Sequence, residues 1–227
     1  LHKAIRRQRQ MCIRDREEGI PFVLKDKQVY LPFIGYLLSN ENERKISPVH
    51  LISFLTQKVI LVAIYEKWEN VTASKAAIRL GVTKMSANRC FDEIEYLNVD
   101  ILGMKGKSRV ITVPADIQKL WNDVRVILRN PVIARYELKE DIQLGKKAGI
   151  TALCEYSLLS DNEYPTYAIT KKEITESGIR KMKQVHSGEE IGCVVLELGY
   201  FIDFKNKKLE DPLSVTCLLY TSDAADE

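Results

Sequence analysis

Two short helical patterns joined by one glycine constrain the fold of this chain more than any other feature of its 227 residues. Thr72 can cap a helix over residues 73–80, and Gly81 supplies the left-handed backbone that a tight turn requires. Thr83 can cap a second helix. The buried face of that helix would hold Ala87, Cys90, Phe91, Ile94 and Leu97. The spacing therefore predicts two helices packed closely about a turn.

A strand-forming segment follows the second helix. Asn98 lies where that helix must end, and asparagine is the best substitute for glycine at a left-handed cap. Ile101 and Leu102 lead to a turn over residues 103–107, and a β-branched run follows over residues 109–113. Helix, turn, helix and basic hairpin is the order of a winged helix-turn-helix. These residues, roughly 50 to 128, resemble the MarR-like winged-helix regulators of bacteria.

Further helices are predicted on both sides of this motif. From Pro48, the residues spaced for a buried helix face are Leu51, Phe54, Leu55, Val59, Val62, Ala63 and Tyr65. After Pro114, a helix over residues 116–128 carries an apolar stripe of Ile117, Leu120, Trp121, Val124 and Ile127 or Leu128. The resemblance implies that flanking helices form a dimer contact, so we expect a homodimer. Packing within one domain is the alternative explanation of both apolar faces.

Positive charge gathers on the motif. Residues 50–129 carry twelve Lys and Arg against eight Asp and Glu, whereas residues 130–215 carry twelve against fourteen. Because Arg can pair with guanine and Asn with adenine, the start of the second helix is the expected base-reading group. The hairpin cations are expected to meet phosphates or a minor groove. The expected DNA-binding residues are Thr83, Lys84, Ser86, Asn88, Arg89, Lys105, Lys107 and Arg109.

Both ends of the chain differ from the rest. RRQRQMCIRDR (residues 6–16) and CLLYTSDAADE (residues 217–227) resemble translations of a transposase adapter used to prepare short-read DNA libraries. We therefore expect residues 1–16 and 216–227 to be foreign and the C-terminal part to be truncated. A natural basic arm is the alternative for the first segment. Without these segments the chain has 28 Lys and Arg and 27 Asp and Glu, against 34 and 31 overall. The total charge therefore gives no argument for a nucleic-acid partner.

Residues 130–215 are expected to form a small, truncated α+β domain after the winged helix. Strands are predicted at residues 164–170 and 193–204. The AG-x-x-AL motif that begins at Ala148 and the DPLS motif that begins at Asp211 are similar to motifs in a group of bacterial winged-helix proteins. The layout also resembles abortive-infection (type IV) antitoxins. That resemblance implies a repressor whose C-terminal domain has a toxin-like protein partner.

The sequence carries no signature of an enzyme, cofactor or metal site. His186 beside Glu189 is interpreted as a surface turn. Glu155, Glu197 and Asp203 are interpreted as solvated or hydrogen-bonded side chains, because their spacing fixes no ligand geometry. The three remaining cysteines, Cys90, Cys154 and Cys193, are an odd number and lack the spacing of metal ligands. We therefore expect buried thiols in a reducing cytoplasm. No apolar run approaches the roughly 18 residues of a membrane span.

Together these patterns predict an α+β protein in five segments. Between the two adapter-like ends lie an extended lead-in (residues 17–47), a winged helix-turn-helix (residues 48–129) and the α+β domain (residues 130–215). The expected function is sequence-specific binding of double-stranded DNA and transcriptional regulation, without catalysis. The alternative is an antitoxin or another protein-interaction module whose C-terminal domain neutralises a partner, with DNA binding for autoregulation. A further alternative is that the polar face of the second helix is only solvated beside a basic turn, as in winged-helix modules that bind proteins instead of DNA.

Overall fold

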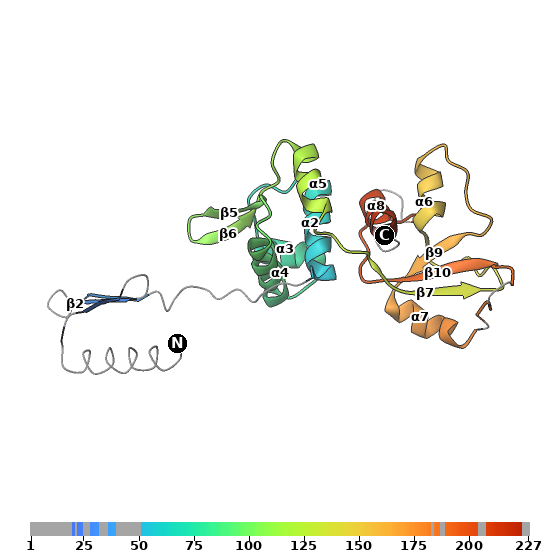
Figure 1. Cartoon of the computed structure of the whole chain (residues 1–227), viewed down its shortest axis with the longest axis horizontal. Helices are drawn as coiled ribbons and strands as arrows, with labels where there is room; N and C mark the ends of the chain where they lie inside the picture. The colour runs from blue at the N-terminus through green and yellow to red at the C-terminus, as the bar shows by residue number, and fades with distance from the viewer. Residues whose placement is uncertain are drawn as a thin grey trace. The chain divides into compact units, whose positions relative to one another are not determined.

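The structure, a computed structural model, describes residues 51–182, 184–186, 189–203 and 208–223, together with Ile20 and three short strands before them. The chain is a mixed α+β protein (Figure 1). It divides into two compact units, residues 1–47 and residues 48–227. The adapter-like residues 1–16 lie outside the described part of the chain.

The described strands of the first unit form an antiparallel sheet. They are β1 (Phe22–Leu24), β2 (Gln28–Leu31) and β3 (Tyr36–Ser39), paired in that order. The lead-in predicted as extended therefore contains paired strands.

Helix α2 (Phe54–Glu66) is the first helix of the second unit, and most of its residues are buried. The Ser53 hydroxyl caps the helix by accepting a hydrogen bond from the Thr56 backbone N–H, so the helix begins at Phe54, six residues after Pro48. Leu51, predicted on the buried face, precedes the helix and is 59% exposed. Nearly every residue of α2 from Thr56 to Ile64 is buried, as expected for a helix that is covered on more than one side.

Helices α3 (Ala73–Leu80) and α4 (Lys84–Tyr96) match the predicted pair. The Thr72 hydroxyl caps α3, the Thr83 hydroxyl caps α4, and Gly81 takes a φ of +66° in the turn between them. Asn98 takes a φ of +53° just after α4. The buried residues of α4 are Ala87, Cys90, Phe91 and Ile94, while Leu97 is partly buried.

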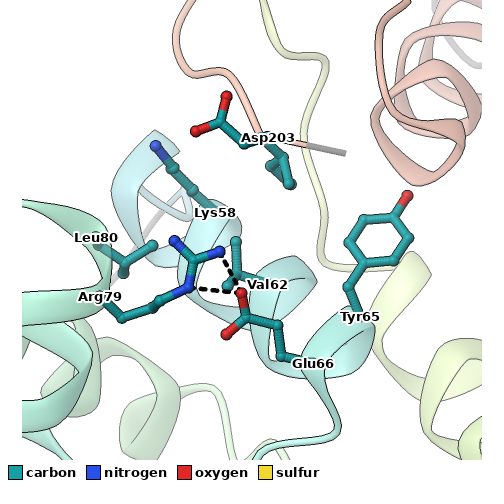
Figure 2. A pocket seen from close by; sticks show the side chains of 8 residues that line it. Lys58, Val62, Tyr65, Glu66, Arg79, Leu80 and Asp203 are labelled. Atoms are coloured by element: carbon teal, nitrogen blue, oxygen red, sulfur yellow. Dashed lines mark hydrogen bonds and ion pairs between the residues drawn. The ribbon is translucent and has the colours of Figure 1, made fainter. Parts of the chain in front are cut away.

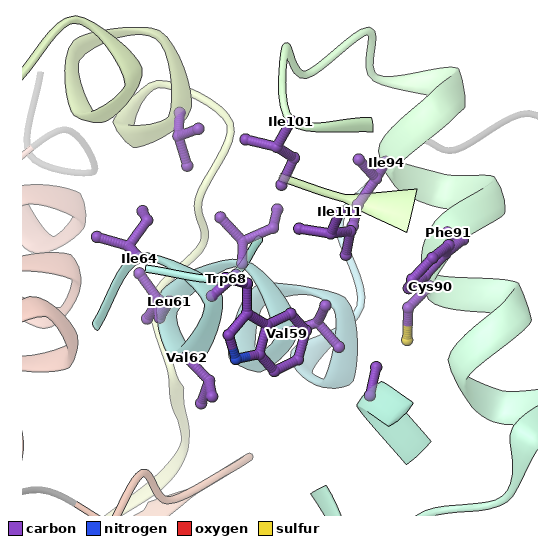
Figure 3. Close-up of a cluster of buried hydrophobic side chains, with 14 of the residues drawn as sticks. Val59, Leu61, Val62, Ile64, Trp68, Cys90, Phe91, Ile94, Ile101 and Ile111 are labelled. Atoms are coloured by element: carbon purple, nitrogen blue, oxygen red, sulfur yellow. The ribbon is translucent and has the colours of Figure 1, made fainter. Parts of the chain in front are cut away.

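A three-stranded antiparallel sheet packs beside these helices, in the order β4-β6-β5. Its strands are β4 (Val71–Thr72), β5 (Leu102–Lys105) and β6 (Ser108–Ile111). Lys105 pairs with Ser108, so the turn is the two residues Gly106 and Lys107 and not the five predicted. Gly106 alone has a positive φ there, which fits a type II′ hairpin turn. Figure 3 shows Phe91 and Ile94 of α4 and Ile111 of β6 in one core with α2 and Trp68.

Helix α5 (Ile117–Arg125) follows, capped by the Asp116 carboxylate, and is shorter than the predicted 116–128. Its apolar stripe points inward, with Leu120, Val124 and the following Leu128 buried in the same core as α2. The stripe therefore packs within the chain, which was the alternative to a dimer contact.

The remaining residues form a four-stranded sheet of order β7-β10-β9-β8 with helices. The strands are β7 (Val132–Leu138), β8 (Lys146–Lys147), β9 (Thr166–Ile169) and β10 (Cys193–Leu198). The helices are α6 (Gly149–Tyr156), α7 (Lys171–Ser177), the 3₁₀ helix η3 (Ile179–Lys181) and α8 (Pro212–Asp223).

Strand β10 is central in this sheet, parallel to β9 and antiparallel to β7. All six of its residues are buried, so its apolar run reflects burial on both faces and not alternation. It ends at Leu198, earlier than the predicted end at residue 204. Helix α8 continues past residue 215, where the adapter-like segment was placed, and Cys217 is buried in the core that contains α2.

A buried polar junction joins α2 to the C-terminal half of the same unit. The Gln57 amide donates to the Arg129 carbonyl (2.9 Å) and the Tyr200 hydroxyl (3.0 Å), and accepts from the Arg129 N–H (3.0 Å). The Tyr65 hydroxyl donates to Asp211 Oδ1 (2.8 Å) and accepts from the Leu213 N–H (2.9 Å). The face of α2 that could have met a partner subunit is therefore covered by the chain itself.

Replacing Tyr65 with Phe removes the hydroxyl that links α2 to the start of α8. Because the Asp211 carboxylate and the Leu213 N–H lose their hydrogen bonds to that hydroxyl, we expect the free energy of unfolding in urea to fall by about 1–3 kcal/mol. Tyr96→Phe makes the same change on an exposed side chain of α4 and should alter that free energy by less than about 0.5 kcal/mol. Equal stabilities of the two variants would contradict the role given to Tyr65.

Candidate nucleic-acid interface

The first turn of α4 presents an exposed, cationic surface. Thr83, Lys84 and Arg89 are exposed, and neither Lys84 nor Arg89 forms an ion pair with any residue that the structure describes. The start of a helix also has free backbone N–H groups and a partial positive charge, which favour a bound anion. This end of α4 is therefore suited to approach a polyanion.

Two of the predicted base-reading residues are less free than the sequence suggests. The Ser86 hydroxyl lies 2.9 Å from the Thr83 hydroxyl, and the Ser86 N–H donates to that same oxygen (3.1 Å), so both side chains serve the helix cap. Asn88 is half-buried on the edge of the exposed face. Lys84 and Arg89 are thus the predicted residues with the most freedom to contact another molecule.

The hairpin tip adds a second cationic surface. Lys105 and Lys107 lie on either side of Gly106 and are both exposed. In the part of the chain that the structure covers, neither lysine forms an ion pair, so both ammonium groups are available to an anion. The four exposed cations Lys84, Arg89, Lys105 and Lys107 therefore lie on two separate elements of one core.

Arg109, a predicted DNA contact, forms ion pairs within the protein. Its guanidinium Nη1 lies 2.7 Å from Glu95 Oε2 and 2.8 Å from Asp92 Oδ1, and only 15% of its side chain is exposed. The guanidinium carbon also lies 5.8 Å from the centre of the Phe91 ring. Arg109 thus ties the hairpin to α4. Two carboxylates spaced three apart on α4, opposite a strand arginine, are the signal that could have indicated this pairing.

This pairing also makes the surface of α4 less negative. Asp92 and Glu95 belong to the second half of α4, where their charges would repel a phosphate backbone. Because one guanidinium pairs with both carboxylates, one of their two negative charges is offset within the protein. The first turn of α4, where the exposed cations begin, contains no acidic residue.

In the described part of the C-terminal half, the acidic residues singled out in the sequence form separate contacts. The Glu189 carboxylate accepts a hydrogen bond from the His186 backbone N–H and pairs with Lys139, both of which lower its pKa. Glu155 pairs with Lys147, and the buried Glu197 accepts from Tyr136 and Arg180. No group of three or more potential metal ligands occurs among the described residues.

The cysteines lie apart as free thiols in the described region. Cys90, Cys193 and Cys217 are buried, and Cys154 is partly exposed. Burial raises the pKa of the Cys90 thiol to about 11, so it stays protonated and behaves as a small apolar side chain.

A pocket lies among α2, α3 and the segment after β10 (Figure 2). Burial, and to a smaller degree Arg79, lowers the pKa of the Lys58 ammonium, while the charge of Asp203 opposes this shift. Arg79 Nε donates to Glu66 Oε1 (2.6 Å). Two cations and two carboxylates thus line the pocket, and this balance favours no class of charged ligand.

A buried carboxyl lies at the start of α6. Glu210 is 2% exposed, and its Oε2 accepts a hydrogen bond from the Gly149 N–H (3.3 Å). Its Oε1 has no hydrogen-bond partner in the described part of the chain. Burial, together with the charge of Asp211, raises the pKa of Glu210 to about 8. The folded protein therefore holds a proton at neutral pH that the unfolded chain releases.

Comparison of the chain with models of known protein families, with curated proteins and with solved structures gave no match. No helix in the described residues is both long and apolar enough to cross a membrane.

Replacing Arg109 with Met keeps the apolar stem and removes both ion pairs. We expect the free energy of unfolding to fall by about 1–2 kcal/mol, because the pairs are partly buried and two carboxylates are left facing each other. Lys107→Met, on the same hairpin but exposed, should change it by less than about 0.5 kcal/mol. Chemical denaturation of both variants measures this. An unchanged Arg109 variant would show that the contact to α4 contributes nothing.

Stability should fall as pH rises through the range between the ordinary carboxyl pKa, 4.5, and the Glu210 pKa of about 8. In that range the folded state binds one more proton than the unfolded state, so the slope approaches about 1.4 kcal/mol per pH unit. Glu210→Gln should remove this slope and match wild type near pH 5. Glu163→Gln, the same change at an exposed residue, should retain it. Parallel urea-midpoint curves for wild type and Glu210→Gln would contradict the assignment.

Proposed function

We propose that the chain binds double-stranded DNA through a winged helix-turn-helix and acts as a transcriptional regulator. In this assignment α4 enters the major groove, and the β5–β6 hairpin is the wing that follows the backbone. The observation that carries the proposal is the pair of exposed, unpaired cationic surfaces at the start of α4 and at the hairpin tip. The resemblance of residues 50–128 to MarR-like regulators supports it.

The division of labour follows from the chemistry of each group. Arg89 can make two parallel hydrogen bonds to guanine, and Asn88 can do the same to adenine, so these residues would carry sequence preference. Lys84, Lys105 and Lys107 are flexible point charges suited to phosphates, and Thr83 and Ser86 shape the turn that faces DNA. Arg109 positions the wing against α4.

A homodimer is part of the proposal. Two copies related by a two-fold axis would place their α4 helices about 34 Å apart on one face of DNA, which fits two half-sites. Because the apolar stripes of α2 and α5 are buried within the chain, the dimer contact would use other surfaces.

A second candidate is an antitoxin or another protein-interaction module with DNA binding for autoregulation. The observation that favours it is the loop after α6, where Leu158 is fully exposed and Leu159 is 61% exposed. Adjacent exposed leucines are often found at protein contacts, although isolated ones are common on any surface. The resemblance to type IV antitoxins supports the same role, and the two candidates are compatible.

The first test is binding of the full chain to genomic DNA fragments across a salt series, by filter binding or fluorescence anisotropy. We expect selective binding whose affinity falls steeply with salt. The double variant Asn88→Ala with Arg89→Ala should lose about 1–3 kcal/mol of discrimination for each contact removed. Lys105→Ala with Lys107→Ala should weaken binding to all sequences alike and lower the salt slope by about two.

The matched control is Lys171→Ala with Lys172→Ala, which removes two exposed charges from α7. Its affinity and salt slope should stay close to wild type. Absence of DNA affinity at low salt would overturn the proposal and direct attention to a protein partner. Losses that follow only the number of positive charges removed (one, two and two in the three double variants) would show that binding depends on net charge alone.

A further inference from the structure

An apolar side chain lies in the middle of the cationic surface at the start of α4. Met85 is the second residue of that helix and is 67% exposed, between Lys84 and Ser86. It contributes nothing to the buried face of α4, which is formed by Ala87, Cys90, Phe91 and Ile94. The core therefore does not require methionine at this position.

Met85 shares one stripe of α4 with the residues proposed to read bases. Asn88 and Arg89 follow it by three and four residues, and side chains at these spacings are neighbours on a helix surface. The contact is direct on one side, since Arg89 Nη2 lies 3.9 Å from Met85 Sδ. A molecule that binds Arg89 at this surface therefore comes close to Met85.

The chemistry of DNA limits what Met85 can contact there. Phosphates and most base edges in the major groove are polar, and the C5-methyl group of thymine is the apolar exception among the four ordinary bases. Methionine is flexible and polarisable, so it adapts to such a group without a fixed pocket. A thymine methyl against Met85 would remove apolar surface of both partners from water.

We propose that Met85 is a specificity-determining residue that contacts the C5-methyl group of a thymine in the major groove. The inference rests on the proposed function and deepens it. One helical turn rises about 5.4 Å and one base step about 3.4 Å, so this thymine lies one or two base pairs from the pair contacted by Asn88 or Arg89. Met85 thereby selects A·T over G·C at a position where no hydrogen bond does so.

The test removes that one methyl group. A site is selected from random duplex DNA with the full-length wild-type protein, and each thymine in it is then replaced singly by deoxyuridine, which keeps the base-pairing edge. At one position in each half-site we expect the wild-type affinity to fall about three- to tenfold. Met85→Ala should bind the thymine site more weakly by a similar factor and show no further loss with deoxyuridine.

Two further variants separate apolar contact from other roles. Met85→Leu keeps an apolar side chain and should retain sensitivity to the methyl group, whereas Met85→Gln has a similar length and should lose it. All three variants should keep the wild-type unfolding midpoint, because the side chain is exposed.

The outcomes distinguish this inference from the proposed function. If the wild type binds DNA selectively but every deoxyuridine substitution affects wild type and Met85→Ala equally, Met85 reads no methyl group while DNA binding stands. If the wild type binds no DNA, both fail together. A methyl effect that disappears only in Met85→Ala and Met85→Gln establishes the contact.

Discussion

The burial of α2 is the constraint on which the second unit depends. Apolar residues cover almost the whole circumference of this helix, so one layer of partners cannot shield it from water. The α3, α4 and hairpin core covers one part, and Tyr200, Ile202 and α8 cover another. The helix also buries Gln57, whose amide would be costly without partners. Its bonds to the Arg129 backbone and the Tyr200 hydroxyl therefore fix how both halves pack on α2.

The candidate interface depends on a second, smaller arrangement. Arg109 holds the hairpin against α4 and offsets the charges of two carboxylates that would otherwise face an approaching polyanion. One side chain thus links the two elements and lowers the negative charge between them. Lys84, Arg89, Lys105 and Lys107 contribute little to packing, since they are exposed. If homologues retain positive charge at these four positions, the reason would be binding and not folding.

Local chemistry made much of the helical region predictable. The hydroxyls of Thr72 and Thr83 and the glycine at position 81 act within one helical turn, so their pattern in the sequence is enough to place α3 and α4. What could not be predicted depends on distant residues. Tyr65 meets Asp211 across 146 positions, and β4 is a strand only because β6 pairs with it. In the candidate site, exposure of Lys84 and Arg89 followed from helical spacing, whereas the pairing of Arg109 depended on how a hairpin lies against a helix.

The polar junction has a consequence for how such a chain can evolve. Proteins whose domains are joined only by a linker can exchange one domain for another with little adjustment. Here Gln57, Tyr65, Tyr200 and Asp211 must match in position and in hydrogen-bonding direction. A different α2 region in place of this one would carry hydrogen-bond donors and acceptors without partners at the polar junction. We therefore expect substitutions at these four positions to destabilise the unit unless they change together.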